Sequence, residues 1–97
     1  MFVAVCRLEI HIESASSLKD KRGVVQSLIH RVGNQFRVSI AEIEALEAHN
    51  LAVLGIATVS NDGGHARKML EEAVRFIERT RLDAEVGQVE FDVLSAL

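Results

Sequence analysis

Residues 2–13 read FVAVCRLEIHIE and establish the pattern from which the rest of the chain can be interpreted. Apolar side chains occupy every even position, and from position 7 onward the odd positions carry charged or polar side chains. Successive side chains of a strand point to opposite faces of a sheet, so this period of two predicts a strand that is buried on one face only. The odd, exposed series is Arg7, Glu9, His11 and Glu13.

Small hydroxyl residues interrupt the alternation at 14–17, and a helix is predicted to begin near Leu18. Ser17 is followed three residues later by Asp20, which resembles a capping box with the shorter acid. Beyond it, apolar residues recur at spacings of three and four, which is typical of a helix with one buried stripe. The stripe is Leu18, Val25, Leu28, Ile29, Val32 and Phe36, and Gly33-Asn34 is expected to end the helix.

The remaining sequence predicts three more strands and a second helix. Residues 38–43 suggest a strand whose uneven apolar spacing requires a bulge or a short strand. Residues 51–59 are almost all apolar, as in a central strand covered on both faces. The segment 60–64 forms a turn, residues 66–80 carry the second helical stripe, and residues 87–93 alternate again. No proline interrupts any of these elements.

The order strand, helix, strand, strand, helix, strand predicts an α+β fold, a ferredoxin-like βαββαβ sandwich. Residues 1–97 would form one such domain, with a four-stranded antiparallel sheet and both helices on one face of it. On the open face we expect Arg7, Glu9 and His11 beside Gln88, Glu90 and Asp92, together with Leu54 and Ile56 or their odd-numbered neighbours. A partly apolar sheet face of this kind is expected to be the contact surface of a homodimer.

Composition and charge narrow the classes of function. The 97 residues carry a formal net charge of −3, so the chain as a whole has no positive field to attract nucleic acid or an anionic membrane. The apolar runs are shorter than the roughly 20 residues of a membrane helix, which predicts no membrane association and a cytoplasmic location. Cys6 is the single cysteine and falls in the buried series, so a structural thiol is expected.

Three segments together carry a family resemblance. They are SLKDKR at 17–22, VSIAE at 38–42 and LGIATVSND at 54–62, in that order. With these the chain resembles, nearly end to end, the YlxP-like bacterial proteins, a family numbered 503 among the domains of unknown function. The resemblance implies a ferredoxin-like fold and no established activity. Its members are often encoded beside translation-initiation and ribosome-maturation factors. Between 44 and 51, where relatives commonly carry an Asp-Leu-Trp-Gln-Arg stretch, this chain has Glu-Ala-His-Asn-Leu at 47–51.

The start of the first helix is the candidate anion site. Cations there oppose the helix dipole, so their presence calls for a reason, and free amides with hydroxyls and cations are a chemistry suited to phosphate. The leading hypothesis is therefore a non-enzymatic binding module that associates with RNA or a ribosome assembly intermediate at this point. The candidate residues are Ser16, Ser17, Lys19, Lys21 and Arg22. The competing interpretation is a solvated first turn that Asp20 partly neutralises.

Two alternatives use the same features differently. One is a structural homo-oligomer that pairs through the open sheet face at Arg7, Glu9 and His11, and the other is a binder of a small phosphorylated ligand at the helix start. No catalytic set, phosphate-cradling loop or cofactor motif is found, and the four histidines lack the spacing of metal ligands, so neither a metal nor a cofactor is predicted. With four Phe and no Tyr or Trp, base stacking on the sheet face is not expected.

Overall fold

The computed structural model of the chain describes residues 1–80 and 83–97. Along these residues the elements are β1 (Phe2–His11), α1 (Leu18–Gln35), β2 (Ser39–Glu44), β3 (Leu51–Ser60), α2 (Gly63–Thr80) and β4 (Glu85–Ser95). The strands form one sheet in the order β2-β3-β1-β4, and each neighbouring pair is antiparallel. This arrangement confirms the predicted α+β fold, a βαββαβ sandwich of the ferredoxin-like type.

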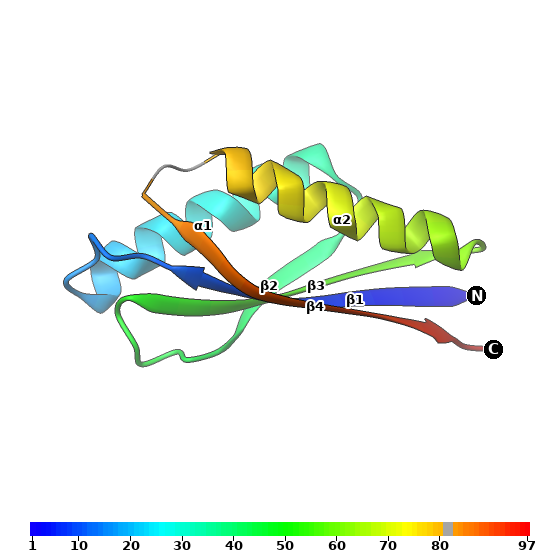
Figure 1. The fold of residues 1–97 in the computed structure, drawn as a ribbon, viewed down its shortest axis with the longest axis horizontal. Helices are drawn as coiled ribbons and strands as arrows, with labels where there is room; N and C mark the ends of the chain where they lie inside the picture. Colours follow the sequence, from blue (N-terminus) through cyan, green and yellow to red (C-terminus); the bar gives the residue numbers. More distant parts are fainter. Residues whose placement is uncertain (81–82) are drawn as a thin grey trace.

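Both helices lie on the same side of the sheet, as the ribbon in Figure 1 shows with the sheet viewed nearly edge-on. The two chain ends meet at one end of the molecule, where Phe2 is paired with Ser95 and the amide of Ala96 donates to the carbonyl of Met1 at 2.8 Å. The opposite end carries the β2–β3 loop and the start of α1. The fold therefore offers one covered and one uncovered sheet face.

The alternation in β1 holds along its whole length. The even-numbered residues from Ala4 to Ile10 are buried beneath the helices, and Arg7, Glu9 and His11 lie on the uncovered face. Register with β1 extends this division to the neighbouring strands, because directly paired residues share a face. Cys6 pairs with Ile56 and Phe91 on the helix side, and Arg7 pairs with Gly55 and Glu90 on the uncovered side.

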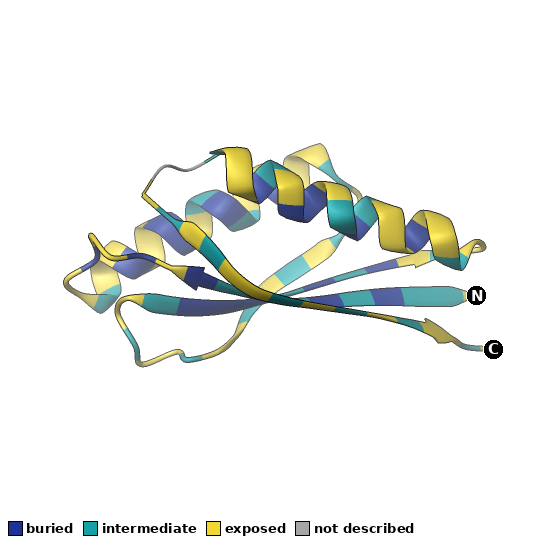
Figure 2. Ribbon diagram, viewed as in Figure 1, coloured by how far each residue is buried: buried dark blue, intermediate teal, exposed yellow. Residues whose placement is uncertain are grey.

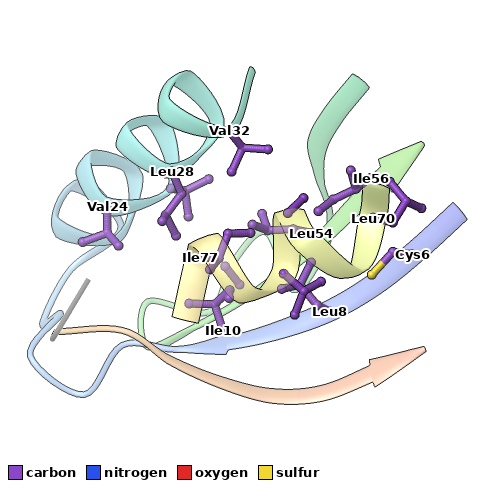
Figure 3. Close-up of a cluster of buried hydrophobic side chains, with 14 of the residues drawn as sticks. Cys6, Leu8, Ile10, Val24, Leu28, Val32, Leu54, Ile56, Leu70 and Ile77 are labelled. Atoms are coloured by element: carbon purple, nitrogen blue, oxygen red, sulfur yellow. The ribbon is translucent and has the colours of Figure 1, made fainter. Parts of the chain in front are cut away.

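The core fills the space between the helices and the sheet. Figure 3 shows Leu8, Ile10 and Leu54 from the strands directed at Leu28 and Ile77 from the helices. All five are at most 2% exposed. In Figure 2 the buried side of each helix faces the sheet and the exposed side faces away from it, so the helical stripes predicted from sequence do define the packing.

Two expectations need correction at β3 and at the end of α1. Residues 51–59 were expected to be covered on both faces, but only the helix face is covered along the strand's whole length, and Val59 is 65% exposed. The open face therefore takes the odd-numbered alternative, Gly55 and Ala57, and not Leu54 or Ile56. Helix α1 continues past Gly33-Asn34 to Gln35, because Phe36 supplies the C-terminal cap with a hydrogen bond to the carbonyl of Val32.

The bulge expected in the second strand is present, since the pairing of β2 with β3 shifts between Glu42 and Glu44.

Of the helices in the described residues, neither is long and apolar enough to cross a membrane.

Cys6 tests the buried face of β1. The thiol is 3% exposed, and its burial raises the pKa to about 11, because the charge of a thiolate would have to sit in the core. We expect Ellman's reagent at neutral pH to react with the native protein far more slowly than with protein unfolded in guanidinium. Equal rates in the two states would show that the thiol is open to solvent and that the register of β1 is wrong.

Candidate functional site

The start of α1 is closed by its own side chains. Ser17 is the N-cap, and its Oγ accepts a hydrogen bond from the amide of Asp20 at 3.1 Å. The carboxylate of Asp20 in turn accepts from the amide and the hydroxyl of Ser16, at 3.1 and 3.0 Å. These bonds lower the pKa of Asp20, with the amide of Ser16 as the largest cause. The amide of Asp20 and the hydroxyls of Ser16 and Ser17, which an external anion would need, are thus already engaged within the cap.

Lys21 was predicted to belong to the anion site, but it does not lie at the surface with the other candidates. Its side chain is 3% exposed, and its ammonium donates to the carbonyl oxygens of Ala45, Leu46 and Leu51 at 2.9, 3.3 and 3.3 Å. A carboxylate oxygen of Glu42 lies 2.8 Å from the same nitrogen. The carboxylate of Glu42 makes the shortest of these four contacts and supplies the balancing charge. Lys21 therefore ties α1 to the β2–β3 loop.

The other predicted residues of that site stay at the surface. Ser16 and Ser17 are exposed and belong to the cap, and Lys19 and Arg22 are exposed on the first turns of the helix. The structure thus brings the two serines together around Asp20 but separates Lys21 from Lys19 and Arg22 by burying it.

On the uncovered face, the predicted residues Arg7, Glu9 and His11 do lie side by side along β1. The guanidinium of Arg7 contacts carboxylates from three strands: Glu9 of β1 at 3.8 Å, Glu90 of β4 at 3.6 Å and Glu44 of β2, which accepts a hydrogen bond from Nε. The bond to Glu44 is the largest reason why the pKa of Arg7 is raised. Arg7 is therefore the cationic centre of a cluster in which carboxylates outnumber it.

His11 packs at the edge of this cluster, above the backbone of β4. Its Nε2 lies 3.9 Å from a carboxylate oxygen of Glu9, and a Cβ placed on Gly87 would come within 2.7 Å of the same nitrogen. The imidazole thus takes the space that a side chain at position 87 would fill, at the point where the pairing of β1 with β4 becomes irregular.

A hollow of about 620 Å³ lies next to Arg7 on the same face, and sequence reasoning did not identify it. Its floor consists of small residues on adjacent strands, Ala41, Gly55 and Ala57, and Ile43 and Val5 supply larger apolar walls. The signal was present in Gly55, since a glycine inside a strand often marks a close approach. Here the approaching group is Ile43, whose Cγ2 would be 3.0 Å from an added Cβ.

We next ask whether the described residues could bind a metal ion or supply a nucleophile. Among residues 1–80 and 83–97, no group of three or more His, Cys, Asp or Glu side chains is arranged to hold a metal ion. The thiol of Cys6 is buried on the other side of β1. What the uncovered face offers is an apolar hollow beside a charged cluster, which is the chemistry of a binding surface.

The Lys21 tie yields a stability prediction. Lys21→Ala removes the cation that faces Glu42 and a donor to the carbonyls of Leu46 and Leu51. Because the lysine is buried but Glu42 is 20% exposed, we expect a loss of about 3 kcal/mol in the free energy of unfolding. The exposed Lys19→Ala is the matched control and should change it by no more than about 0.5 kcal/mol. Urea titrations followed by circular dichroism measure both. Equal midpoints for the two variants would show that the buried ammonium does not hold the loop.

Comparison with known proteins places the chain in a family. Residues 3–91 match the family described as "Protein of unknown function (DUF503)". The chain is also similar to a Bacillus subtilis (strain 168) protein described as "Uncharacterized protein YlxP", with 36% identity over 76 residues that cover 78% of this chain and 83% of that relative. The match includes nearly every element of the fold, from β1 into β4. The chain therefore belongs to the DUF503 family.

Proposed function

We propose that this protein is a binding module for another protein, and that its binding surface is the uncovered face of the sheet. The observation that carries the proposal is the hollow over Gly55 and Ala57, which places an apolar depression at the centre of the face that the helices leave bare. Its volume of about 620 Å³ falls within the range of pockets that hold a partner's side chains or a small ligand.

The chemistry of this face argues against nucleic acid as its occupant. Arg7 is surrounded by Glu9, Glu44 and Glu90, so the field at the surface repels phosphate. No phenylalanine in the described part of the chain offers a stacking platform on this face. Phe36 and Phe76 pack edge to face against each other, Phe91 shares the helix side of the sheet with Cys6, and the ring of Phe2 lies against Gly63 at the start of α2. An apolar hollow with a charged rim is the arrangement typical of a protein interface, which supports a protein partner.

Association with RNA, a ribosome assembly intermediate or a small phosphorylated ligand at the start of α1 stays a prediction with less support. Lys19 and Arg22 are the exposed cations available there, since Lys21 is engaged with the β2–β3 loop. The capping bonds of Ser17 and Asp20 use groups that an anion would need.

A photo-crosslinking experiment tests the proposal and requires no candidate partner. Benzoylphenylalanine is introduced at Ser39, an exposed residue at the edge of the hollow, at Glu72 on the exposed side of α2 as the matched control, and at Lys19 to sample the helix start. After irradiation in living cells, we expect a discrete protein adduct, identified by mass spectrometry, from position 39 and none from position 72. Adducts from position 19 alone, or equal adducts from 39 and 72, would contradict an open-face binding module.

A homodimer through this face is the second candidate, and one observation favours it. Val3, Val59 and Leu94 pair across the sheet in one row beside the hollow, and Val59 and Leu94 are 65% and 49% exposed. In a symmetric dimer the same surface meets itself, so it must carry both protruding side chains and a depression that receives them. The row supplies protruding apolar side chains next to the hollow.

Sedimentation velocity tests the homodimer directly. If a second copy covers the face, the wild-type chain should sediment as a dimer at about 50 μM, where a micromolar interface is filled, and Val59→Asp should sediment as a monomer. Leu46→Asp is the matched control, because Leu46 is a similarly exposed apolar residue, at 57%, that lies in the β2–β3 loop. A monomeric wild type would exclude this candidate and leave a different protein as the occupant.

A further inference from the structure

The uncovered face is acidic around Arg7. Among the described residues, two guanidinium groups offset its carboxylates: Arg7 inside the cluster, and Arg37, which lies beside Val3, Ala57 and Val59. Five carboxylates against two guanidiniums give this face a net charge of −3 with His11 neutral. The carboxylates are Glu9, Glu44, Glu85, Glu90 and Asp92.

The cluster around Arg7 is short of cations. One guanidinium at the centre meets Glu9, Glu44 and Glu90, so its charge is shared among three carboxylates that repel one another. These side chains are partly exposed, at 26%, 51% and 59%, and water screens them now. A partner that covered the face would remove this water, and the excess carboxylates would then require added positive charge.

The charge deficit and the apolar hollow are parts of one surface. Arg7, Glu90 and Asp92 form the charged rim of the hollow whose apolar lining is Val5, Ala41 and Ile43. Along β1 the surface changes from apolar at Val3 and Val5 to acidic at Glu9, a distance of about 13 Å between Val5 and Glu9 at the rise of a strand. A partner segment needs an apolar group and cationic groups separated by no more than this distance.

From these observations, and resting on the open-face function proposed above, we propose that the partner is a cationic amphipathic segment of another protein. One large apolar side chain of that segment fills the hollow over Gly55 and Ala57. Lysine or arginine side chains within about four residues of it in an extended segment, or about two turns of a helix, lie against Glu9, Glu44 and Glu90. Arg7 keeps the carboxylates apart and in place before the segment arrives.

The negative charge of the face favours a cationic segment over the other molecules that could cover it. A second copy would bring one acidic face against another, so a dimer must either restrict its contact to the apolar row at Val3 and Val59 or accept this repulsion. An acidic peptide or a nucleic acid meets the same repulsion over the whole surface. A cationic segment is attracted by it.

Fluorescence anisotropy with short labelled peptides tests the inference on the intact chain. The probe peptide alternates lysine with leucine; a second peptide has glutamate in place of lysine, and a third has serine in place of leucine. We expect saturable binding of the first alone, weakened by added salt. Glu9→Gln/Glu90→Gln should weaken it about tenfold, because two of the three carboxylates around Arg7 lose their charge. The control Glu72→Gln/Glu78→Gln changes the net charge equally on the exposed side of α2 and should have no effect.

A hollow-filling variant separates the two components of the surface. Ala57→Phe keeps every carboxylate and should abolish the advantage of the leucine peptide over the serine peptide. Equal weakening by the open-face and α2 variants would overturn the inference, as would equal binding of the glutamate peptide. The proposed function fails separately: a crosslink from position 39 to an acidic segment or to a second copy would preserve the open-face module and exclude the cationic partner.

Discussion

A four-stranded sheet has two faces, and the chain supplies helices for only one of them. This constraint governs the placement of almost every side chain in the strands. Leu8, Leu54 and Ile56 are excluded from water because α1 and α2 lie above them, and Arg7 and Glu9 face solvent one position away. Burial of the even series contributes the hydrophobic driving force for the fold, whereas the odd series is free to carry charge. Any interaction surface on the sheet must therefore consist of the odd-numbered residues of β1 and the residues that pair with them.

The strands differ in how much of this division the sequence could predict. In β1 the alternation of apolar and charged residues identifies the buried face without ambiguity, and the structure agrees. In β3 both faces are apolar, so the sequence predicts a strand but not which series is covered, and the pairing of Arg7 with Gly55 decides it. The hollow was missed for the same reason: small residues in β2 and β3 become one depression only when register brings them together.

For Lys21, the sequence could have predicted that the side chain is buried, but not which groups it contacts. It is four residues before Val25 and seven before Leu28, so it lies on the buried stripe of α1 in spite of its charge. Its acceptors are the carbonyls of Ala45, Leu46 and Leu51, which are 24 to 30 residues away and become neighbours only in the folded chain. A cation in phase with an apolar stripe is thus a signal of a buried ion pair, and interpreting SLKDKR as an exposed basic motif overlooked it.

The two edge strands of the sheet, β2 and β4, are poorly suited to pair with another chain, which favours the open face as the contact surface. Antiparallel pairing of β4 with a second β4 about Phe91 would set Glu90 directly opposite Asp92 in both directions, and like charges in that position destabilise a pair. On the other side, β2 offers only the short edge Ser39–Glu44, which a bulge interrupts. Acidic residues thus discourage edge pairing and at the same time surround the hollow on the open face. One set of carboxylates can therefore limit self-association through strands and select, on the face, for a partner that brings positive charge.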